Sequence, residues 1–291
     1  MRAALLTCVL LVSVLQLSAQ QTSTTHPTVS SVLDRINSAS RTEREKAFGE
    51  AGELLGSDAI SPRDADRLRL GIIQLLVREN NEGLKERDEV KQASPAPSAG
   101  EVQEEEGEED SDYYSGLIGF VANLNDERAI PALLGAANTG GIATRGVARF
   151  GKRALDATLM QAKNANPDLA EGALWVIRDM LEFGLVSDPE SLQRIKSAIR
   201  SALDAPDVGL RDTGVYLVGY LDKREEFVPK LKDIAEHDPA KLPNQPKDDG
   251  TVGDFYFVRV NAARVLEQIA NHVQPPIDRG LPPSEYEPVK P

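Results

Sequence analysis

The residues that could carry out chemistry are few in this sequence of 291 residues. It contains three histidines, His26, His237 and His272, and a single cysteine, Cys8. The histidines are far apart and have polar neighbours, as is typical of surface and helix-cap positions. The sequence has no glycine-rich phosphate loop and no G-x-S-x-G element. We therefore expect no catalytic residues, no metal site and no cofactor.

A basic cluster is the first candidate for a binding site. Arg145, Arg149, Lys152 and Arg153 lie within nine residues of one another in a chain with a formal charge of −13. Arg145 and Arg149 are four residues apart and so share one face of a helix. The cluster has two interpretations: a solvated helix end, or a patch that captures an acidic segment. That segment could come from a protein partner or from the chain's own acidic tract, residues 101–112.

Aromatic residues are the second candidate, because aromatic anchors carry much of the energy of protein interfaces. Tyr216 and Tyr220 are four residues apart, beside the apolar positions of a predicted helix, so we expect them to face outward together. Trp175 is one position from an apolar face, which favours a place in the core.

The beginning of the chain indicates export. Residues 1–19 have the pattern of a signal peptide: a positive Arg2, an apolar run from Ala3 to Leu17, and small residues before a cleavage point at Gln20 or Gln21. The run is short for a membrane-spanning helix, which makes an uncleaved anchor the alternative. Cleavage would remove Cys8 and leave a protein without disulfides. We expect a periplasmic or extracellular protein with no membrane span in the mature chain.

Composition limits the class of partner. Apolar residues make up 41% of the chain, enough for a packed core, and 46 acidic residues exceed 33 basic ones. Nucleic acid binding needs clustered positive charge on a large scale, so we do not expect a nucleic acid partner. A protein or peptide partner fits better.

Composition also divides the chain into segments. After the signal peptide come a disordered leader (20–29) and a helical N-terminal unit (30–87) with apolar residues at three- and four-residue steps. Residues 88–112 are rich in Pro, Ser and Glu, which predicts an acidic disordered linker. Residues 272–291 form a proline-rich tail. We expect the tail to cover the last repeat, or alternatively to bind an aromatic groove of a partner.

Residues 113–271 contain a weak internal repeat. Five segments align when the positions three, four, seven and ten residues after an anchor are compared, and among these positions only Arg153 is neither apolar nor glycine. This spacing puts them on one helix face. The anchors are Tyr114, Ala143, Ala170, Arg211 and Arg259.

A second set of predicted helices alternates with the first, at 128–137, 152–163, 189–203 and 225–236. Longer spacings suggest insertions around 183–187 and across 239–253. Helix pairs in tandem, each covering the apolar stripe of its neighbour, form an all-α superhelix or solenoid. Whether residues 30–87 form a separate unit or belong to the same array is open at this point.

The segments FVRVNAARVLEQI (257–269), DERAIPALLGAA (126–137) and LRDTGVYLVGYL (210–221) resemble halves of the HEAT-like repeat, including the kind found in phycobilisome lyases. The resemblance implies an armadillo-like α-solenoid. It also raises two enzyme activities. Bilin lyases act in a pigment-assembly setting that does not suit an exported chain. Deoxyhypusine hydroxylase requires His-Glu pairs for iron, and this sequence has no His-Glu dipeptide.

We therefore expect an exported, non-enzymatic scaffold or adaptor that binds a protein or peptide through its solenoid surface. The alternative is an enzyme or enzyme-maturation factor, lyase-like, that uses the solenoid as a substrate cradle. A single deep pocket with convergent polar groups would favour that alternative.

Overall fold

A computed structural model describes residues 27–57, 59–93, 108–246, 252–275 and 287–290, and leaves the side chains of 87–93 and 108–111 undescribed. The signal peptide, most of the leader and residues 94–107 of the expected linker lie outside these ranges. The chain divides into two compact units, Met1–Ile60 and Ser61–Pro291. Each unit is described by itself.

The first unit is a helical hairpin of α2 (Val29–Ile36) and α3 (Arg41–Leu55). Helix α2 begins with a capping box, in which the Thr28 hydroxyl accepts from the Ser31 amide at 3.2 Å and the Ser31 hydroxyl accepts from the Thr28 amide at 3.1 Å. Val32 of α2 and Ala47 of α3 are fully buried. An ion pair between Arg35 and Glu50 joins the two helices.

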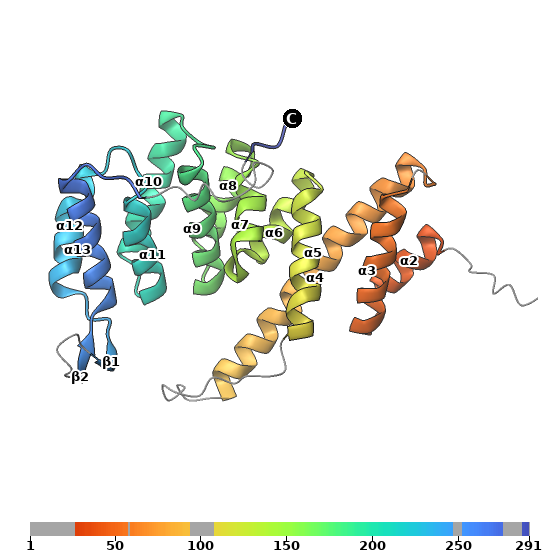
Figure 1. Cartoon of the computed structure of the whole chain (residues 1–291), viewed down its shortest axis with the longest axis horizontal. Helices are drawn as coiled ribbons and strands as arrows, with labels where there is room; N and C mark the ends of the chain where they lie inside the picture. Colours follow the sequence, from red (N-terminus) through yellow and green to blue (C-terminus); the bar gives the residue numbers. More distant parts are fainter. Residues whose placement is uncertain (1–26, 58, 94–107, 247–251, 276–286, 291) are drawn as a thin grey trace, which may run out of the picture. The chain divides into compact units, whose positions relative to one another are not determined.

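The second unit consists of helix pairs that follow one another in two layers (Figure 1). Within the described residues, the first layer contains α5, α7, α9, α11 and α13, each in contact with the next. The second layer contains α4, α6, α8, α10 and α12, and each of these packs on the first-layer helix that follows it. The helices are α4 (Pro62–Ala93), α5 (Glu108–Asn123), α6 (Ile130–Gly135), α7 (Gly141–Ala148), α8 (Lys152–Gln161), α9 (Pro167–Glu182), α10 (Pro189–Leu203), α11 (Val208–Val218), α12 (Val228–His237) and α13 (Phe257–Ala270), with 3₁₀ turns η1 (Glu127–Ala129), η2 (Ala137–Thr139) and η3 (Glu225–Phe227).

This arrangement confirms the predicted α-solenoid. The five anchors of the sequence repeat fall in α5, α7, α9, α11 and α13, and the alternate set falls in α6, α8, α10 and α12. Repeat positions such as Leu117, Ile177 and Val215 are fully buried between neighbouring helices. In α13, by contrast, Leu266 is only half-buried, because α13 is the last helix of the described row.

Local sequence signals begin the helices of the central repeats. Asn166, Asp188 and Asp207 are N-cap residues of α9, α10 and α11, and each accepts a hydrogen bond from a main-chain amide of the first turn. Pro167 and Pro189 occupy the first helical positions of α9 and α10, where proline needs no hydrogen-bond partner.

Helix α4 belongs to the second unit, which differs from the expected division of the chain into 30–87 and 113–271. The Asn80 side chain donates to the Ala132 carbonyl at 2.7 Å and accepts from the Tyr114 hydroxyl at 2.6 Å, so it joins α4 to α5 and α6. The array therefore begins at α4, on the N-terminal side of the acidic segment. Helix also extends into both ends of the expected 88–112 linker, since α4 ends at Ala93 and α5 begins at Glu108.

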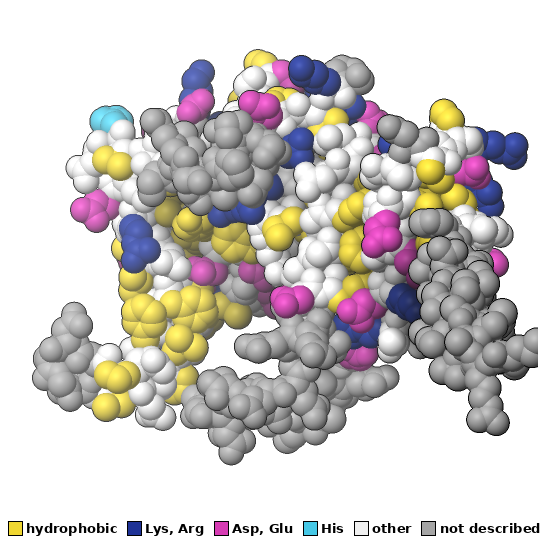
Figure 2. Space-filling model, turned by 45° about the vertical axis from the view of Figure 1, so that its right-hand side comes forward, with side chains coloured by type: hydrophobic (Ala, Val, Ile, Leu, Met, Phe, Trp, Pro, Cys, Tyr) yellow, Lys and Arg dark blue, Asp and Glu magenta, His cyan; other side chains and the backbone are white. Residues whose placement is uncertain are grey.

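The insertion predicted across 239–253 contains a small antiparallel hairpin of β1 (Leu242–Pro246) and β2 (Val252–Phe255). Leu242 pairs with Phe255 and Pro246 with Val252. Leu242, Val252 and Phe255 are 41–64% exposed, and hydrophobic side chains gather at the hairpin in Figure 2. In the described part of the chain no helix is long and apolar enough to cross a membrane.

Candidate binding site at the loop edge

The turn between α7 and α8 brings the basic cluster together. Helix α7 ends at Ala148, and Gly151 then takes a left-handed conformation, with φ of 55°, before α8 begins at Lys152. A Cβ atom at Gly151 would lie 2.9 Å from the Leu185 carbonyl oxygen, so only glycine fits. This tight turn places Arg149 and Arg153 at one edge of the solenoid, on either side of Gly151. We call the edge formed by the loops 149–151, 183–188 and 219–224 the loop edge.

Arg145 and Arg149 lie together, as their spacing predicted. Both line a cleft of about 410 Å³. Helices α5 and α7 supply its lining residues, which are Gly119, Ala122, Asn123, Ile142, Arg145, Gly146 and Arg149. Arg145 folds back over Gly141 at the start of its own helix.

Lys152 and Arg153 have acidic partners from neighbouring repeats. Lys152 Nζ lies 3.5 Å from a carboxylate oxygen of Asp188, and Arg153 pairs with Glu127. The Arg153 guanidinium also lies over the Phe150 ring, 5.4 Å from its centroid. Arg153 was the one polar residue among the repeat positions, and the reason is now clear: α7 has only eight residues, so this position falls in α8.

The described end of the proline-rich tail binds to this basic cluster. Arg149 Nε donates to the Glu287 carbonyl oxygen at 3.0 Å, and Arg153 donates to the Val289 carbonyl oxygen. The Val289 amide donates in turn to the Arg149 carbonyl oxygen at 2.9 Å. Three main-chain atoms of a short segment are thus held by two arginines.

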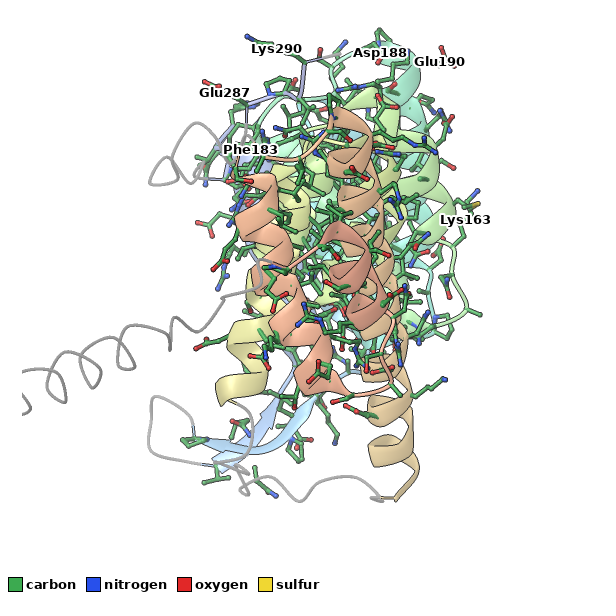
Figure 3. The ribbon with its side chains drawn as sticks, turned by 90° about the vertical axis from the view of Figure 1, so that its right-hand side faces the viewer. Lys163, Phe183, Asp188, Glu190, Glu287 and Lys290 are labelled. Atoms are coloured by element: carbon green, nitrogen blue, oxygen red, sulfur yellow. The ribbon has the colours of Figure 1, made fainter. Side chains whose placement is uncertain are left out.

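Figures 1 and 3 show where this contact lies in the second unit. Glu287 and Lys290 are at the same end of the helices as Asp188 and Glu190, and the β1–β2 hairpin is at the opposite end. The beginning of the tail is also on the loop edge, where the buried Arg224 donates to the Val273 carbonyl oxygen. The prediction that the tail covers the last repeat is therefore wrong for residues 287–290, which bind at the turn between α7 and α8, three helix pairs before the end of the array.

Burial and charge oppose each other at Arg149. Partial burial lowers the pKa of the Arg149 guanidinium, while the Glu287 carboxylate favours its charged form. The pKa stays far above neutrality for any arginine, so Arg149 is a permanent cationic donor. Hydrogen bonds from a charged donor are the stronger kind, worth about 1.5–3 kcal/mol each.

Tyr216 of α11 and Tyr220, just after the end of that helix, form a separate aromatic cluster with Trp175 of α9. Their hydroxyl oxygens are 3.1 Å apart, and Tyr216 is 41% exposed while Tyr220 is half-buried. Burial raises the pKa of the Tyr220 phenol, so it is protonated at neutral pH. Trp175, which we expected in the core, is only half-buried and contacts the Tyr216 ring edge-on, with centroids 5.6 Å apart.

A buried carboxylate lies beside this cluster. Asp179 is fully buried and accepts from Arg178 Nε at 2.8 Å, and Arg178 lies over the Trp175 ring. Burial raises the pKa of Asp179, although Arg178 opposes the shift. Arg178 thus contacts both the buried Asp179 carboxylate and the Trp175 ring of the aromatic cluster.

The basic cluster and the aromatic cluster can bind a segment of polypeptide, and we derive no chemical step from them. Among the described residues no three or more His, Cys, Asp or Glu side chains come together as metal ligands would. His237 is exposed and lies 3.2 Å from Asp233 at a helix end.

Comparisons with known proteins add little. No family model matches the sequence, and no curated protein matches it. Among solved structures, a designed armadillo repeat protein in complex with the peptide (KR)4 is 14% identical, with a TM-score of 0.34 over 83% of this chain and 99% of that one. Computationally designed armadillo repeat proteins for modular peptide recognition are 13% identical, with a TM-score of 0.36 over 82% of this chain and 99% of that one. These TM-scores are low, so the solenoid rests on the helix contacts described above.

Sequence reasoning selected the basic cluster but missed its occupant. It named the tract 101–112 as the intramolecular candidate, and most of that tract lies outside the described residues. The contact with Glu287 and Val289 uses main-chain atoms of the tail, which no side-chain pattern reveals. Trp175 was missed as a surface residue because a tryptophan one step from an apolar face reads as core.

Proposed function

We propose that this protein is a binding scaffold or adaptor that holds an extended segment of a protein partner along its loop edge. The observation that carries the proposal is the binding of Glu287–Val289 by Arg149 and Arg153. It is an example, within the chain itself, of an extended segment held on this surface by main-chain hydrogen bonds.

Main-chain recognition explains how such a surface could accept a partner segment. The three hydrogen bonds depend on peptide groups and not on particular side chains, so other extended segments can make them. The positive charge at the loop edge then favours acidic sequences, because Arg145 and Arg149 line the same cleft and Glu287 already lies near Arg149. The exposed Tyr216 of α11, with the half-buried Tyr220 beside it, offers a second surface to which a longer partner could extend.

Three parts of the proposal come from the sequence alone. The first nineteen residues have the pattern of a secretion signal, which supports a role in the cell envelope or outside the cell. The scarcity of catalytic residue types supports a role without catalysis. The resemblance to phycobilisome-lyase-type repeats supports the alternative, a lyase-like cradle for a small molecule, and the following experiment separates the two roles.

The test is a selection of displayed ten-residue peptides on the full chain, followed by affinity measurements on synthetic copies. We expect the enriched peptides to lose at least tenfold in affinity when Arg149 and Arg153 are both changed to Ser. The matched control changes Lys163, just after the end of α8, and Arg194 of α10, two basic residues that line a different cleft, and should leave affinity unchanged.

Two results would end the proposal. One is that no peptide is enriched, or that the enriched peptides still bind when Arg149 and Arg153 are both changed to Ser. The other is recovery of a modified small molecule with the protein purified from its native source, which would favour the lyase-like cradle.

A further inference from the structure

The hydrogen bonds of the tail follow an alternating pattern. Glu287 uses its carbonyl oxygen, and Val289 uses both its amide and its carbonyl oxygen. Pro288, between them, has no amide hydrogen to offer. A proline therefore costs no hydrogen bond at this middle position, whereas a proline at the next position would remove the donor to the Arg149 carbonyl oxygen.

We infer that the loop edge selects extended segments of the form x-Pro-Z, in which Z is a non-proline residue with a small apolar side chain, and that Glu287-Pro288-Val289 competes with the partner for this place. The inference rests on the proposed function and specifies its partner. In the free protein, the chain's own tail occupies this place.

Burial along the segment supports this pattern. Val289 is half-buried, whereas Glu287, Pro288 and Lys290 are exposed. The third position is thus the one whose side chain meets the protein. The first position faces the positive charge of Arg149, which favours an acidic residue there.

Proline also favours binding before contact is made. Its ring fixes φ near the extended value, so the free segment has less conformational freedom to lose when it binds. Because the tail belongs to the same chain, its local concentration at the loop edge exceeds that of a separate peptide. A separate peptide must therefore displace the tail from the loop edge in order to bind.

The experiment uses two full-length variants that differ by one tail residue. Val289→Pro removes the amide that donates to Arg149, and Pro288→Ala keeps all three hydrogen bonds. The probe is a fluorescent synthetic peptide with the sequence of residues 282–291, PPSEYEPVKP, and its binding is followed by fluorescence anisotropy.

We expect the probe to bind the Val289→Pro chain at least tenfold more tightly than the wild-type chain, because the competing tail is weakened. The Pro288→Ala chain should bind the probe within about threefold of wild type. A probe that itself carries Val289→Pro should bind none of the chains. Adding Arg149→Ser and Arg153→Ser to the Val289→Pro chain should abolish binding of the unmodified probe.

Equal binding of the probe to the wild-type and Val289→Pro chains would overturn the inference, as would failure to bind either or normal binding of the altered probe. The proposed function could survive each of these results, since displayed peptides of another form could still depend on Arg149 and Arg153. If no displayed peptide depends on these arginines, the proposed function fails first. Thermal unfolding of the variants checks that the fold is intact.

Discussion

Arg211 and Asp238 form a two-pronged ion pair between the start of α11 and the end of α12, with Nε to Oδ2 at 2.8 Å and Nη2 to Oδ1 at 3.3 Å. The Asp238 side chain is 3% exposed and that of Arg211 14% exposed. Arg211 also donates to the Ala205 and Pro206 carbonyl oxygens, and Arg259 of α13 donates to the Asp238 carbonyl oxygen. One pair therefore connects three consecutive helices of the array.

Changing Arg211 to Ala should lower the free energy of unfolding by about 3 kcal/mol, because it leaves the buried Asp238 carboxylate without its partner. Urea unfolding followed by circular dichroism measures this loss. The control is Lys230→Ala, which breaks an exposed pair with Asp204 and should cost less than about 1 kcal/mol. Equal losses would show that burial of the pair does not matter.

The same pair predicts a dependence on acid. Burial opposes the shift, but the hydrogen bond from Arg211 lowers the pKa of Asp238 below its ordinary value. Its contribution to stability is therefore present above the ordinary pKa of about 4 and is lost as the pH falls through the lower folded-state pKa. The difference in unfolding free energy between wild type and Asp238→Asn should shrink over that range. A constant difference would contradict the assignment.

Asp179 should show the opposite dependence. Burial raises its pKa, so the folded protein holds this proton more tightly than the unfolded chain does. The stability of the wild type relative to Asp179→Asn should be greatest below about pH 4 and should fall as the pH rises through the folded-state pKa. Urea unfolding of both proteins at about pH 4, 5.5 and 7 tests the sign. A wild-type advantage that grows with pH would mean that Arg178 outweighs burial.

The turn at Gly151 can be tested against a matched glycine. Gly151 and Gly184 both have positive φ, 55° and 65°, but a Cβ atom would strike the Leu185 carbonyl only at Gly151. Gly184→Ala should cost about 1 kcal/mol from backbone strain alone, and Gly151→Ala about 2 kcal/mol or more. Gly151→Ala should also weaken the peptide binding described above, since it shifts Arg149 against Arg153. Equal losses of stability in the two variants would show that the clash with the Leu185 carbonyl oxygen does not matter.

The proposed export gives a prediction that needs no variant. The protein recovered from its native host should begin at Gln20 or Gln21, and its mass should lack the first nineteen or twenty residues. N-terminal sequencing of the purified protein checks this. A chain that still begins with Met1 or Arg2 would contradict cleavage.

The sequence alone was sufficient for the repeats because their helices bury periodic apolar residues. Ile118, Val147, Leu174 and Val215 recur at the same place in successive segments, four residues after each anchor, and the spacing of such residues is what packing of a helix requires. The connection of α4 to the array could not be read in this way. It depends on the Asn80 side chain meeting Ala132, a polar contact between residues far apart in sequence.

The site was predictable only in part for the same physical reason. Four basic residues close in sequence revealed the basic cluster, because charge is a property of side chains. Its occupant is bound through peptide groups that every residue has, so the side chains of residues 287–289 did not reveal this segment as a ligand. The turn at Gly151 is similarly hidden, since the clash that requires glycine comes from Leu185 in another repeat.

The place of Glu287 after the helical array in the sequence has a consequence for the order of folding. Neighbouring helix pairs join residues that are close in sequence, whereas the contact with Arg149 spans 138 residues and must form late. During synthesis, residues 287–289 leave the ribosome after the array that binds them. Under the proposed function, a newly made molecule thus passes through a period in which its loop edge is complete but uncovered, and a partner present at that moment would meet no competitor.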